Sequence, residues 1–220
     1  MERKTVSVFS PLALYNFVSS LAWCFVLLNA LLLYSRYGQP TAYEYTKDIL
    51  TYVQCGSIIE IFNSLFGIVR SPLLTTAAQV LSRLLVVLGI FQFVPEAPGS
   101  KSIAYITLLL AWCITEVVRY LFYFFNLTRQ TGPPRFILML RYNLFLVLYP
   151  SGVASELYII YSALPLAEEL YGPWARYFLI GSMLTYIPGL PMLFLHMVAQ
   201  RRKVMKTLRE ATAEKTSKND

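Results

Sequence analysis

Charged residues are scarce in this chain of 220 residues. They make up 14% of it, whereas hydrophobic residues make up 56% and the mean hydropathy is +0.53. An ordinary soluble domain is about one quarter charged. The composition therefore excludes a typical soluble domain and predicts an all-α, polytopic membrane protein.

Histidine and cysteine are also rare. The single histidine, His196, has no histidine partner, so an imidazole metal site is not expected. Cys24, Cys55 and Cys113 lie inside apolar runs without metal-ligand spacing, and we interpret them as small buried side chains outside any disulfide framework. Because the chain also has no G-x-G-x-x-G loop, we expect no metal and no bound cofactor.

The net charge of +7 is not evidence for nucleic-acid binding. Much of the excess lies between Arg201 and Lys218, directly after an apolar segment. Basic residues in that position more often fix membrane topology or contact anionic lipid. We therefore expect the lipid bilayer, and not nucleic acid, as a partner.

Six apolar stretches are long enough to cross a bilayer, which takes about 20 residues. They are 12–34, 49–69, 73–94, 103–127, 136–164 and 174–199. Segments with turn residues, such as Arg70-Ser71-Pro72 and Tyr171-Gly172-Pro173, separate them. The sequence predicts a six-helix bundle that forms one domain over residues 1–200, followed by a basic cytosolic tail at 201–220.

Basic residues are unequally divided between the two sides of this predicted bundle. One side has Arg36, Lys47, Lys101 and Arg176. The side with both termini has Arg3, Lys4, Arg70, Arg129, Arg135 and the seven basic residues after Gln200. The positive-inside rule therefore predicts that both termini are cytosolic.

Several ionisable or amide groups fall inside the predicted spans, where a charge costs at least ~2.5–3.5 kcal/mol. They include Glu60, Gln79, Arg83, Glu116 and Arg119. Glu116 and Arg119 are three residues apart, and Gln79 and Arg83 are four apart, so each pair shares a helix face. Two interpretations remain equally open for these groups: ion pairs that fix helix registry, or a functional site.

The segment 141–157 combines polar groups with helix-disturbing residues. On one continuous helix, Arg141, Tyr149 and Glu156 project onto a single face, with Tyr149 and Glu156 ~10 Å apart. Pro150 and Gly152 lie between them, so a kink there would shorten the gap. Counted from Phe136, Glu156 lies ~30 Å along the span, towards the lumenal side.

A carboxylate and a phenol in a dry pocket suit acid–base chemistry. The carboxylate of Glu156 can accept a proton, and the phenol of Tyr149 can donate one. The pair fits proton abstraction beside a carbonyl together with protonation of a leaving hydroxyl. We therefore regard Tyr149 and Glu156 as the candidate catalytic residues.

A second motif is misleading. Cys113 and Arg119 match the C-x5-R spacing of tyrosine phosphatases. That motif acts as a loop whose backbone N–H groups hold phosphate, whereas here it lies within an apolar predicted helix whose backbone groups are already paired. We expect no phosphatase activity.

The chain resembles a known family at these residues. The similarity extends from Leu14 to the basic tail and is strongest over residues 52–90, 108–123, 140–157 and 186–206. These strings are similar to those of the very-long-chain (3R)-3-hydroxyacyl-CoA dehydratases, also called protein tyrosine phosphatase-like membrane proteins. The closest resemblance is to the fungal members that act in fatty-acid elongation.

This resemblance implies a six-span protein of the endoplasmic reticulum membrane that converts 3-hydroxyacyl-CoA to trans-2-enoyl-CoA, in the third step of fatty-acid elongation. The family's YPxGxxSE string places its catalytic pair at Tyr149 and Glu156. Other strings on which the family depends map to Glu60, Gln79, Arg83, Glu116, Arg119, Arg141 and Gly152. The resemblance also implies an acyl-CoA substrate and contact with other elongation enzymes.

The expected mechanism is a syn or anti elimination inside a central apolar tunnel. Glu156 takes the α-proton and Tyr149 protonates the departing hydroxyl, although the reverse assignment stays open if an arginine makes the phenol more acidic. Two rival functions remain. Buried charges also mark proton-coupled transporters, although no inverted repeat is visible, and the chain could be a non-catalytic scaffold for elongation enzymes.

Overall fold

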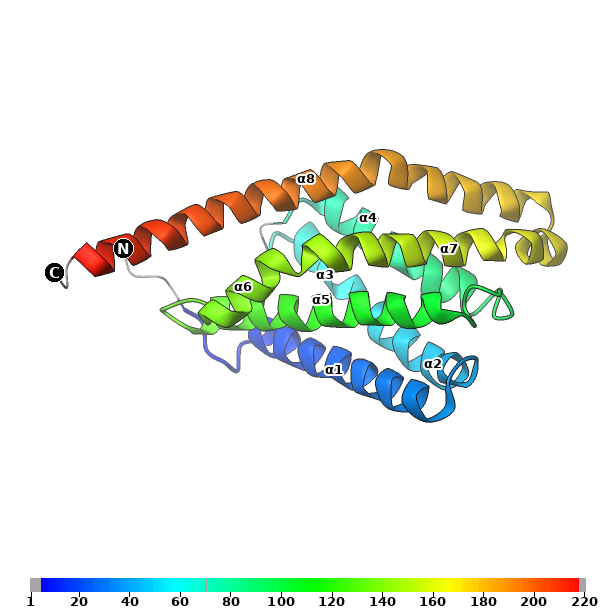
Figure 1. Cartoon of the computed structure of the whole chain (residues 1–220), viewed down its shortest axis with the longest axis horizontal. Helices are drawn as coiled ribbons and strands as arrows, with labels where there is room; N and C mark the ends of the chain where they lie inside the picture. The colour runs from blue at the N-terminus through cyan, green and yellow to red at the C-terminus, as the bar shows by residue number, and fades with distance from the viewer. Residues whose placement is uncertain (1–4, 70, 218–220) are drawn as a thin grey trace.

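The regular elements of the chain are helices throughout the region that the structure describes. This computed structural model describes residues 5–69 and 71–217 (Figure 1). Its elements are α1 (Pro11–Tyr37), α2 (Thr41–Cys55), α3 (Ile58–Leu65), α4 (Leu73–Leu84), the π-helix η1 (Leu85–Ile90), α5 (Ile103–Thr128), α6 (Arg135–Asn143), α7 (Phe145–Tyr171) and α8 (Pro173–Ser217). The all-α prediction is thus confirmed for the described residues.

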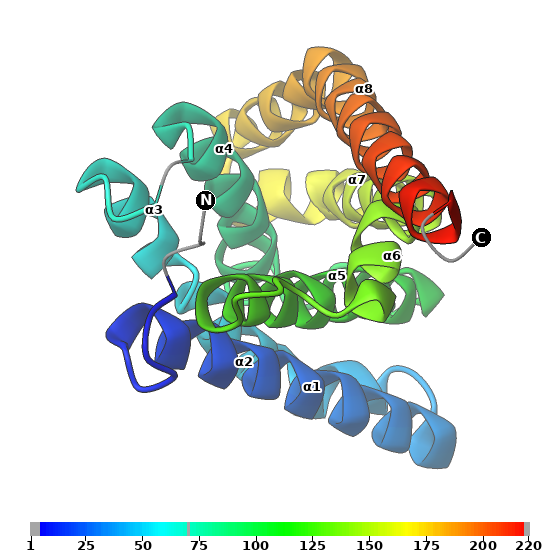
Figure 2. The same cartoon turned by 90° about the vertical axis from the view of Figure 1, so that its left-hand side faces the viewer.

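The long helices form a row that is backed by the shorter ones. In Figure 1, α8, α7, α5 and α1 follow one another from top to bottom, with α4, α3 and α2 behind them. The end-on view in Figure 2 shows α5 between α1 and α7, and α8 beyond α7. Contacts between neighbours in this row hold the bundle together, and α5 packs on both α1 and α7. The start of α1 and the end of α8 lie at the same end of the bundle.

Local capping residues set the ends of the long helices. The Ser10 side chain accepts a hydrogen bond from the backbone N–H of Ala13 at the start of α1, and Ser102 accepts one from Ala104 at the start of α5. Gly38 and Gly172 follow α1 and α7 at φ +68° and +87°, a conformation that glycine adopts without steric strain. These caps explain why two of the predicted breaks occur where they do.

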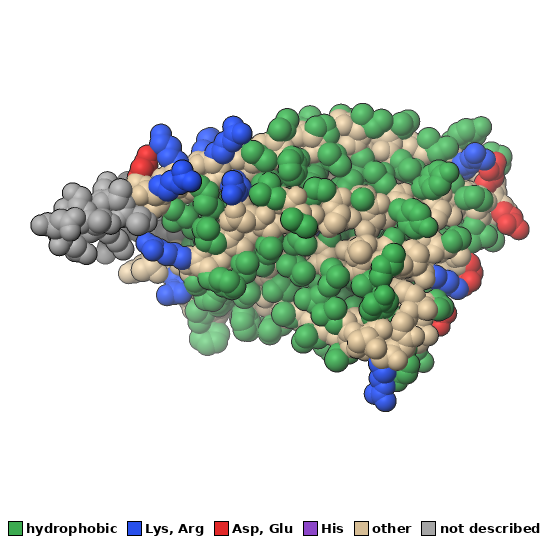
Figure 3. All heavy atoms as spheres, viewed as in Figure 1, with side chains coloured by type: hydrophobic (Ala, Val, Ile, Leu, Met, Phe, Trp, Pro, Cys, Tyr) green, Lys and Arg blue, Asp and Glu red, His purple; other side chains and the backbone are tan. Residues whose placement is uncertain are grey.

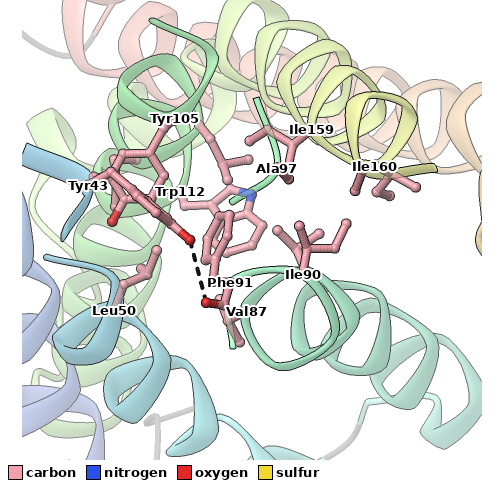
Figure 4. Packing of buried hydrophobic residues seen from close by; sticks show 14 of the residues in the cluster. Tyr43, Leu50, Val87, Ile90, Phe91, Ala97, Tyr105, Trp112, Ile159 and Ile160 are labelled. Carbon is pink, nitrogen blue, oxygen red and sulfur yellow. Dashed lines mark hydrogen bonds between the residues drawn. The ribbon is translucent and has the colours of Figure 1, made fainter. Parts of the chain in front are cut away.

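The buried core lies between α2, η1, α5 and α7 (Figure 4). The rings of Tyr43, Phe91 and Tyr105 meet edge to face, with centroids 5.0–5.5 Å apart. Each phenol has a polar partner, because Tyr105 Oη lies 2.8 Å from Thr46 Oγ1 and Tyr43 Oη donates to the carbonyl oxygen of Phe91 at 3.4 Å. The two tyrosines at the centre of the core therefore satisfy their hydroxyl groups without contact with water.

Five of the six predicted spans have a counterpart among the described helices that are long and apolar enough to cross a membrane. These are Pro11–Tyr37, Leu73–Ile90, Ile103–Thr128, Phe145–Tyr171 and Pro173–Glu210. The remaining stretch, 49–69, does not form one helix. Instead α2 begins earlier, at Thr41, and the chain breaks at Gly56 and Ser57 before α3.

Local hydrogen bonds explain this break. The Ser57 hydroxyl donates to the carbonyl oxygen of Gln54 at 2.6 Å, and the Gln54 amide donates to Ser57 Oγ at 2.8 Å. Side chains that bond to nearby backbone in this way offer it an alternative to the helical ladder. Glycine at position 56 adds little helix propensity of its own, so the helix ends there.

The predicted span 136–164 was wrong in its boundaries. The chain forms α6 and α7 with a break at Leu144, and α6 is inclined to α7 (Figure 1). The Asn143 amide is used at this break, because its oxygen accepts two hydrogen bonds from Arg201 of α8 at 2.9 and 3.0 Å. Consequently Arg141 is not on the same helix as Tyr149 and Glu156, and Glu156 lies only ~16 Å from the start of α7.

The surface pattern suits a membrane protein. Figure 3 shows one face on which hydrophobic side chains cover the middle of the bundle and charged side chains gather at its two ends. The exposed residues along α8 include Phe178, Leu184, Ile187 and Leu195. An apolar surface of this extent would be unusual on a soluble monomer, so the bundle is a membrane protein.

The last helix continues past the predicted tail boundary. α8 runs without a break from Pro173 to Ser217, through Gln200 and Arg201. Four basic residues used to predict topology, Arg3, Lys4, Arg70 and Lys218, lie outside the described residues. The division at residue 200 therefore marks a change in composition and not the end of a helix.

We expect Gly99→Ala to destabilise the fold. A Cβ atom at Gly99 would lie 2.3 Å from Ser162 Oγ and 3.0 Å from the Cα atom of Ile159. Moving the serine would break its 2.9 Å hydrogen bond from the Gly99 N–H. Overpacking of this kind costs ~1–3 kcal/mol, so the thermal midpoint in detergent should fall by several degrees.

The matched control is Gly181→Ala in α8, where an added Cβ meets nothing within 4 Å. Alanine is the better helix former, so this variant should be at least as stable as the wild type. Equal midpoints for the two variants would contradict the close packing of Gly99 against α7.

Candidate functional site

Glu156 is a buried carboxylate at the meeting point of three helices. It lies on α7 with 7% of its surface exposed. The Trp112 indole of α5 donates to its Oε1 at 2.7 Å, and the Tyr186 phenol of α8 donates to its Oε2 at 2.7 Å. Each oxygen therefore has one fixed donor, which holds the carboxylate in a single orientation.

The tryptophan connects this carboxylate to a half-buried arginine. The guanidinium of Arg83, on α4, lies over the Trp112 ring at 5.1 Å from its centroid. A cation over an indole face is attracted by the ring's π electrons. Arg83 also forms an ion pair with Glu116, which lies one turn beyond Trp112 on α5. The indole is therefore held from one side by Arg83 and uses its N–H for Glu156.

The ion pairs continue from Glu116 to α3. Arg119 donates to Glu116 Oε2 at 2.7 Å and to both oxygens of Glu60 at 2.6 and 2.7 Å. The phenol of Tyr120 also donates to Glu60. A bidentate guanidinium–carboxylate pair is among the strongest polar contacts in proteins. Arg83, Glu116, Arg119 and Glu60, which we call the ion-pair network, thus join α3, α4 and α5.

This network stabilises the bundle through complete pairing. It contains two arginines and two glutamates, so its formal charges cancel. Removing one partner from a buried pair typically costs 3–5 kcal/mol, because the other charge is left without compensation. The predicted pairing of Glu116 with Arg119 is confirmed, and the structural interpretation of these four residues has direct support.

Tyr149 lies on α7 almost two turns before Glu156, towards the end of the bundle that holds the termini. Its ring stacks on Phe194 of α8 with centroids 6.2 Å apart and an interplanar angle of 26°. The side chain is half-buried. Among the described residues, the donors to Glu156 are Trp112 and Tyr186, and Tyr149 makes no hydrogen bond to it. The phenol of Tyr149 is therefore separate from the carboxylate in this structure.

Arg141 does not join the catalytic candidates. It lies on α6, where its guanidinium is 4.4 Å from the Phe122 ring centroid and 4.8 Å from that of Tyr123. It also donates to the phenol oxygen of Tyr123 at 3.2 Å. These contacts fix α6 against α5, so the predicted shared face of Arg141, Tyr149 and Glu156 was wrong.

The two remaining predicted residues differ in their surroundings. Gly152 is buried on α7, and a Cβ atom there would lie 3.3 Å from the Cβ of Ala111 on α5. A small residue at that point lets the two helices approach closely. Gln79 is exposed on α4, and its shared helix with Arg83 does not bring its side chain into the ion-pair network.

The phosphatase-like spacing lies inside α5. Cys113 is fully buried, and Arg119 is occupied by Glu60 and Glu116. The backbone from Cys113 to Arg119 is helical and cannot offer a phosphate-binding loop. The prediction that this motif is not a phosphatase site therefore agrees with its conformation.

Sequence reasoning missed the two residues that bind Glu156. Trp112 and Tyr186 lie within the strings used for the family resemblance, but neither was identified as a site residue. A buried indole N–H or phenol O–H needs an acceptor, especially inside a membrane span. The need for an acceptor could have marked Trp112 and Tyr186 as residues with a polar partner. It does not indicate which residue is that partner.

Comparisons with known proteins agree with the family resemblance. The family described as protein tyrosine phosphatase-like protein, PTPLA, matches residues 54–207. A probable very-long-chain (3R)-3-hydroxyacyl-CoA dehydratase of Schizosaccharomyces pombe is 39% identical over 201 residues, 89% of this chain and 92% of that protein. No solved structure matches this chain significantly.

Two animal relatives give the same result. A very-long-chain (3R)-3-hydroxyacyl-CoA dehydratase of Caenorhabditis elegans is 37% identical over 213 residues, 91% of this chain and 96% of that protein. The Homo sapiens dehydratase 2 of the same name is 35% identical over 212 residues, 90% of this chain and 82% of that protein. Because the family match and these alignments cover most of the chain, the protein belongs to the protein tyrosine phosphatase-like (PTPLA) family.

Proposed function

We propose that this protein is a hydro-lyase that dehydrates very-long-chain (3R)-3-hydroxyacyl-CoA to trans-2-enoyl-CoA, and that Glu156 and Tyr149 transfer the protons. The main support is the buried carboxylate of Glu156, which two hydrogen bonds hold in one orientation. The relatives that align over most of this chain are named as dehydratases of this kind. The reaction is the dehydration step of fatty-acid elongation. It needs only a base for the C2 proton and an acid for the C3 hydroxyl.

Glu156 acts as the base. Its carboxylate takes the C2 proton, which the thioester carbonyl makes acidic, and the electron pair forms the C2–C3 double bond. The C3–O bond breaks, and the phenol of Tyr149 donates its proton so that water leaves. The phenolate then recovers a proton, and Glu156 returns its own to solvent. Trp112 and Tyr186 orient the carboxylate during proton transfer, because their hydrogen bonds restrict its rotation.

The separation of Tyr149 and Glu156 fits a substrate lying between them. Seven residues on one helix span ~10 Å, which is too long for a direct contact. The α-carbon and the hydroxyl oxygen of the substrate, or a bound water, would fill this interval. Tyr149 lies nearer the end of the bundle with both termini, so substrate entering from that end meets it first.

The ion-pair network supports catalysis indirectly. Arg83 and Arg119 are both occupied by glutamates. Their positive charges therefore hold α3, α4 and α5 together. The guanidinium of Arg83 also packs on the face of the Trp112 ring. Gly152 contributes by allowing α7 to lie close to α5, which brings Glu156 within reach of the indole. Arg141 holds α6, the helix that precedes α7, against α5.

The chain crosses the membrane six times, with both termini in the cytosol. α2 and α3 supply the sixth crossing, since an odd number of crossings would place the termini at opposite ends (Figure 1). The basic residues Arg201, Arg202, Lys203, Lys206 and Arg209 lie along the last turns of α8. Positive charge there favours a cytosolic location and attracts the phosphates of the CoA head.

The setting proposed for this reaction is the endoplasmic reticulum membrane. The domain at 1–200 carries out the chemistry, and the basic segment at 201–220 contacts the head groups of the substrate and of anionic lipid. The enzymes that make the 3-hydroxyacyl-CoA and reduce the enoyl-CoA are the proposed partners, because both intermediates are bulky and amphipathic and benefit from direct transfer.

We expect Glu156→Gln and Tyr149→Phe to lower kcat at least about a hundredfold, the usual contribution of a positioned general acid or base. Glutamine keeps the shape of the side chain but is not a base, and phenylalanine keeps the ring but has no proton to donate. The measurement is enoyl-CoA formation by purified protein, expressed per folded molecule.

Tyr158→Phe and Glu169→Gln are the matched controls, since both side chains are exposed on α7. They should retain wild-type turnover. Normal dehydration by both Glu156→Gln and Tyr149→Phe would refute the assignment of the pair. Absence of dehydration by the wild type would refute the proposed activity itself.

Tyr186→Phe tests the orientation of Glu156. Loss of one hydrogen bond to a charged group is worth ~1.5–3 kcal/mol, so kcat should fall about tenfold or more while KM changes little. The isotope effect with substrate deuterated at C2 should increase, because proton abstraction from a less well-oriented base becomes slower relative to the other steps.

Tyr177→Phe, at an exposed tyrosine of the same helix, should leave both quantities at their wild-type values. An unchanged isotope effect in Tyr186→Phe, with a lower yield of folded protein, would show that the phenol only stabilises the bundle.

A further inference from the structure

A groove lies between α7 and α8 beside the candidate site. Its volume is about 260 Å³. The residues that line it are Leu157, Met183, Tyr186, Ile187, Leu190 and Pro191. Apart from the Tyr186 phenol, all of these side chains are apolar. A groove of this composition favours a hydrocarbon chain over a polar ligand.

The groove lies beside the carboxylate, and Tyr186 is the lining residue that contacts Glu156. Tyr186 contributes its ring to the groove wall, and its hydroxyl lies 2.7 Å from Glu156 Oε2. Leu157, on the opposite wall, directly follows Glu156 in the sequence. An apolar surface therefore begins next to the carboxylate, at Tyr186, and follows the α7–α8 interface.

The outer side of the groove is bordered by exposed apolar side chains. Ile187 is 69% exposed on its rim, and Leu184 on the neighbouring surface of α8 is 56% exposed. Pro188 and Pro191 lie inside α8 and cannot donate the hydrogen bonds that would close the helical ladder there. α8 also bows along its length in Figure 1. Prolines are a common cause of helix bending, and here they coincide with the groove.

We infer that this groove binds the acyl chain of the substrate and leads it from Glu156 sideways into the bilayer. This inference rests on the proposed function and names the subsite for the chain. A closed tunnel would limit chain length, whereas a groove that opens to lipid leaves the distal part of a long chain in the hydrocarbon of the membrane. This proposal assigns the acyl chain to a lateral path, and the central tunnel expected from the sequence stays a prediction.

A substitution that narrows the groove should act selectively on long chains. In Leu190→Trp, the indole would occupy the space between the two helices. We expect the ratio of kcat/KM for a very-long-chain 3-hydroxyacyl-CoA to that for a short-chain one to fall about tenfold, which corresponds to ~1.4 kcal/mol. Ile187→Trp, at the exposed rim, should change the ratio in the same direction with little risk to folding.

Leu184→Trp is the control, because Leu184 lies on the same helix but outside the groove. It should leave the ratio at its wild-type value. An unchanged ratio in both Leu190→Trp and Ile187→Trp, in a protein that dehydrates both substrates, would overturn the acyl-chain subsite alone. A wild-type protein that dehydrates neither substrate would overturn the proposed function on which the subsite depends.

Photo-crosslinking distinguishes substrate from membrane lipid as the occupant. A 3-hydroxyacyl-CoA with a diazirine in its acyl chain should label Ile187 or Leu190 in proteoliposomes, and unlabelled substrate should remove that labelling. A phospholipid with the same diazirine is the comparison. Labelling by the phospholipid alone, or labelling by the CoA probe that excess substrate does not reduce, would show that the groove is only a lipid contact and would refute the proposal.

Discussion

The hydrogen bonds to Glu156 are the interaction on which the rest of this structure depends. An ionised carboxylate inside a bilayer loses its hydration, and at mid-membrane depth that loss is costly unless protein donors replace water. Trp112 and Tyr186 supply those donors from α5 and α8. This requirement fixes where α7 lies relative to both helices, and the close approach at Gly152 makes the short distance to α5 attainable. The arrangement of the three helices and the orientation of the carboxylate therefore have the same cause.

The sequence was sufficient to predict features that depend on composition and on short-range spacing. Apolar length identified five spans that have a helical counterpart, although the limits predicted for 136–164 were wrong, and the i,i+3 spacing identified the Glu116–Arg119 pair. It was insufficient where tertiary contacts decide the outcome. The break at Leu144 accompanies the contact of Asn143 with Arg201, 58 residues away. The partners of Glu60 and Arg83 come from α5, and nothing in a single sequence specifies these pairings.

The same limit explains why the predicted shared face of Arg141, Tyr149 and Glu156 was wrong. Projection onto one ideal helix placed Arg141 beside Tyr149 and Glu156, but the projection assumed a continuous helix. Trp112 and Tyr186 were overlooked for a related reason, since tryptophan and tyrosine are common in membrane proteins and only their positions in three dimensions distinguish them. The family resemblance implies a catalytic role for Glu156, which stays a prediction, and the structure adds the two donors that orient its carboxylate.

Both oxygens of Glu156 accept a hydrogen bond, but this does not prevent the carboxylate from acting as a base. Each carboxylate oxygen has two lone pairs, and Trp112 and Tyr186 together use one on each oxygen. The remaining lone pairs can accept the proton from C2 while both donors stay in place. The two donors differ in how firmly their surroundings hold them. Trp112 packs against Arg83, which belongs to the ion-pair network. Tyr186 lies on the proline-containing part of α8, beside the groove. Substrate binding is therefore expected to adjust the α8 side and to leave the α5 side unchanged.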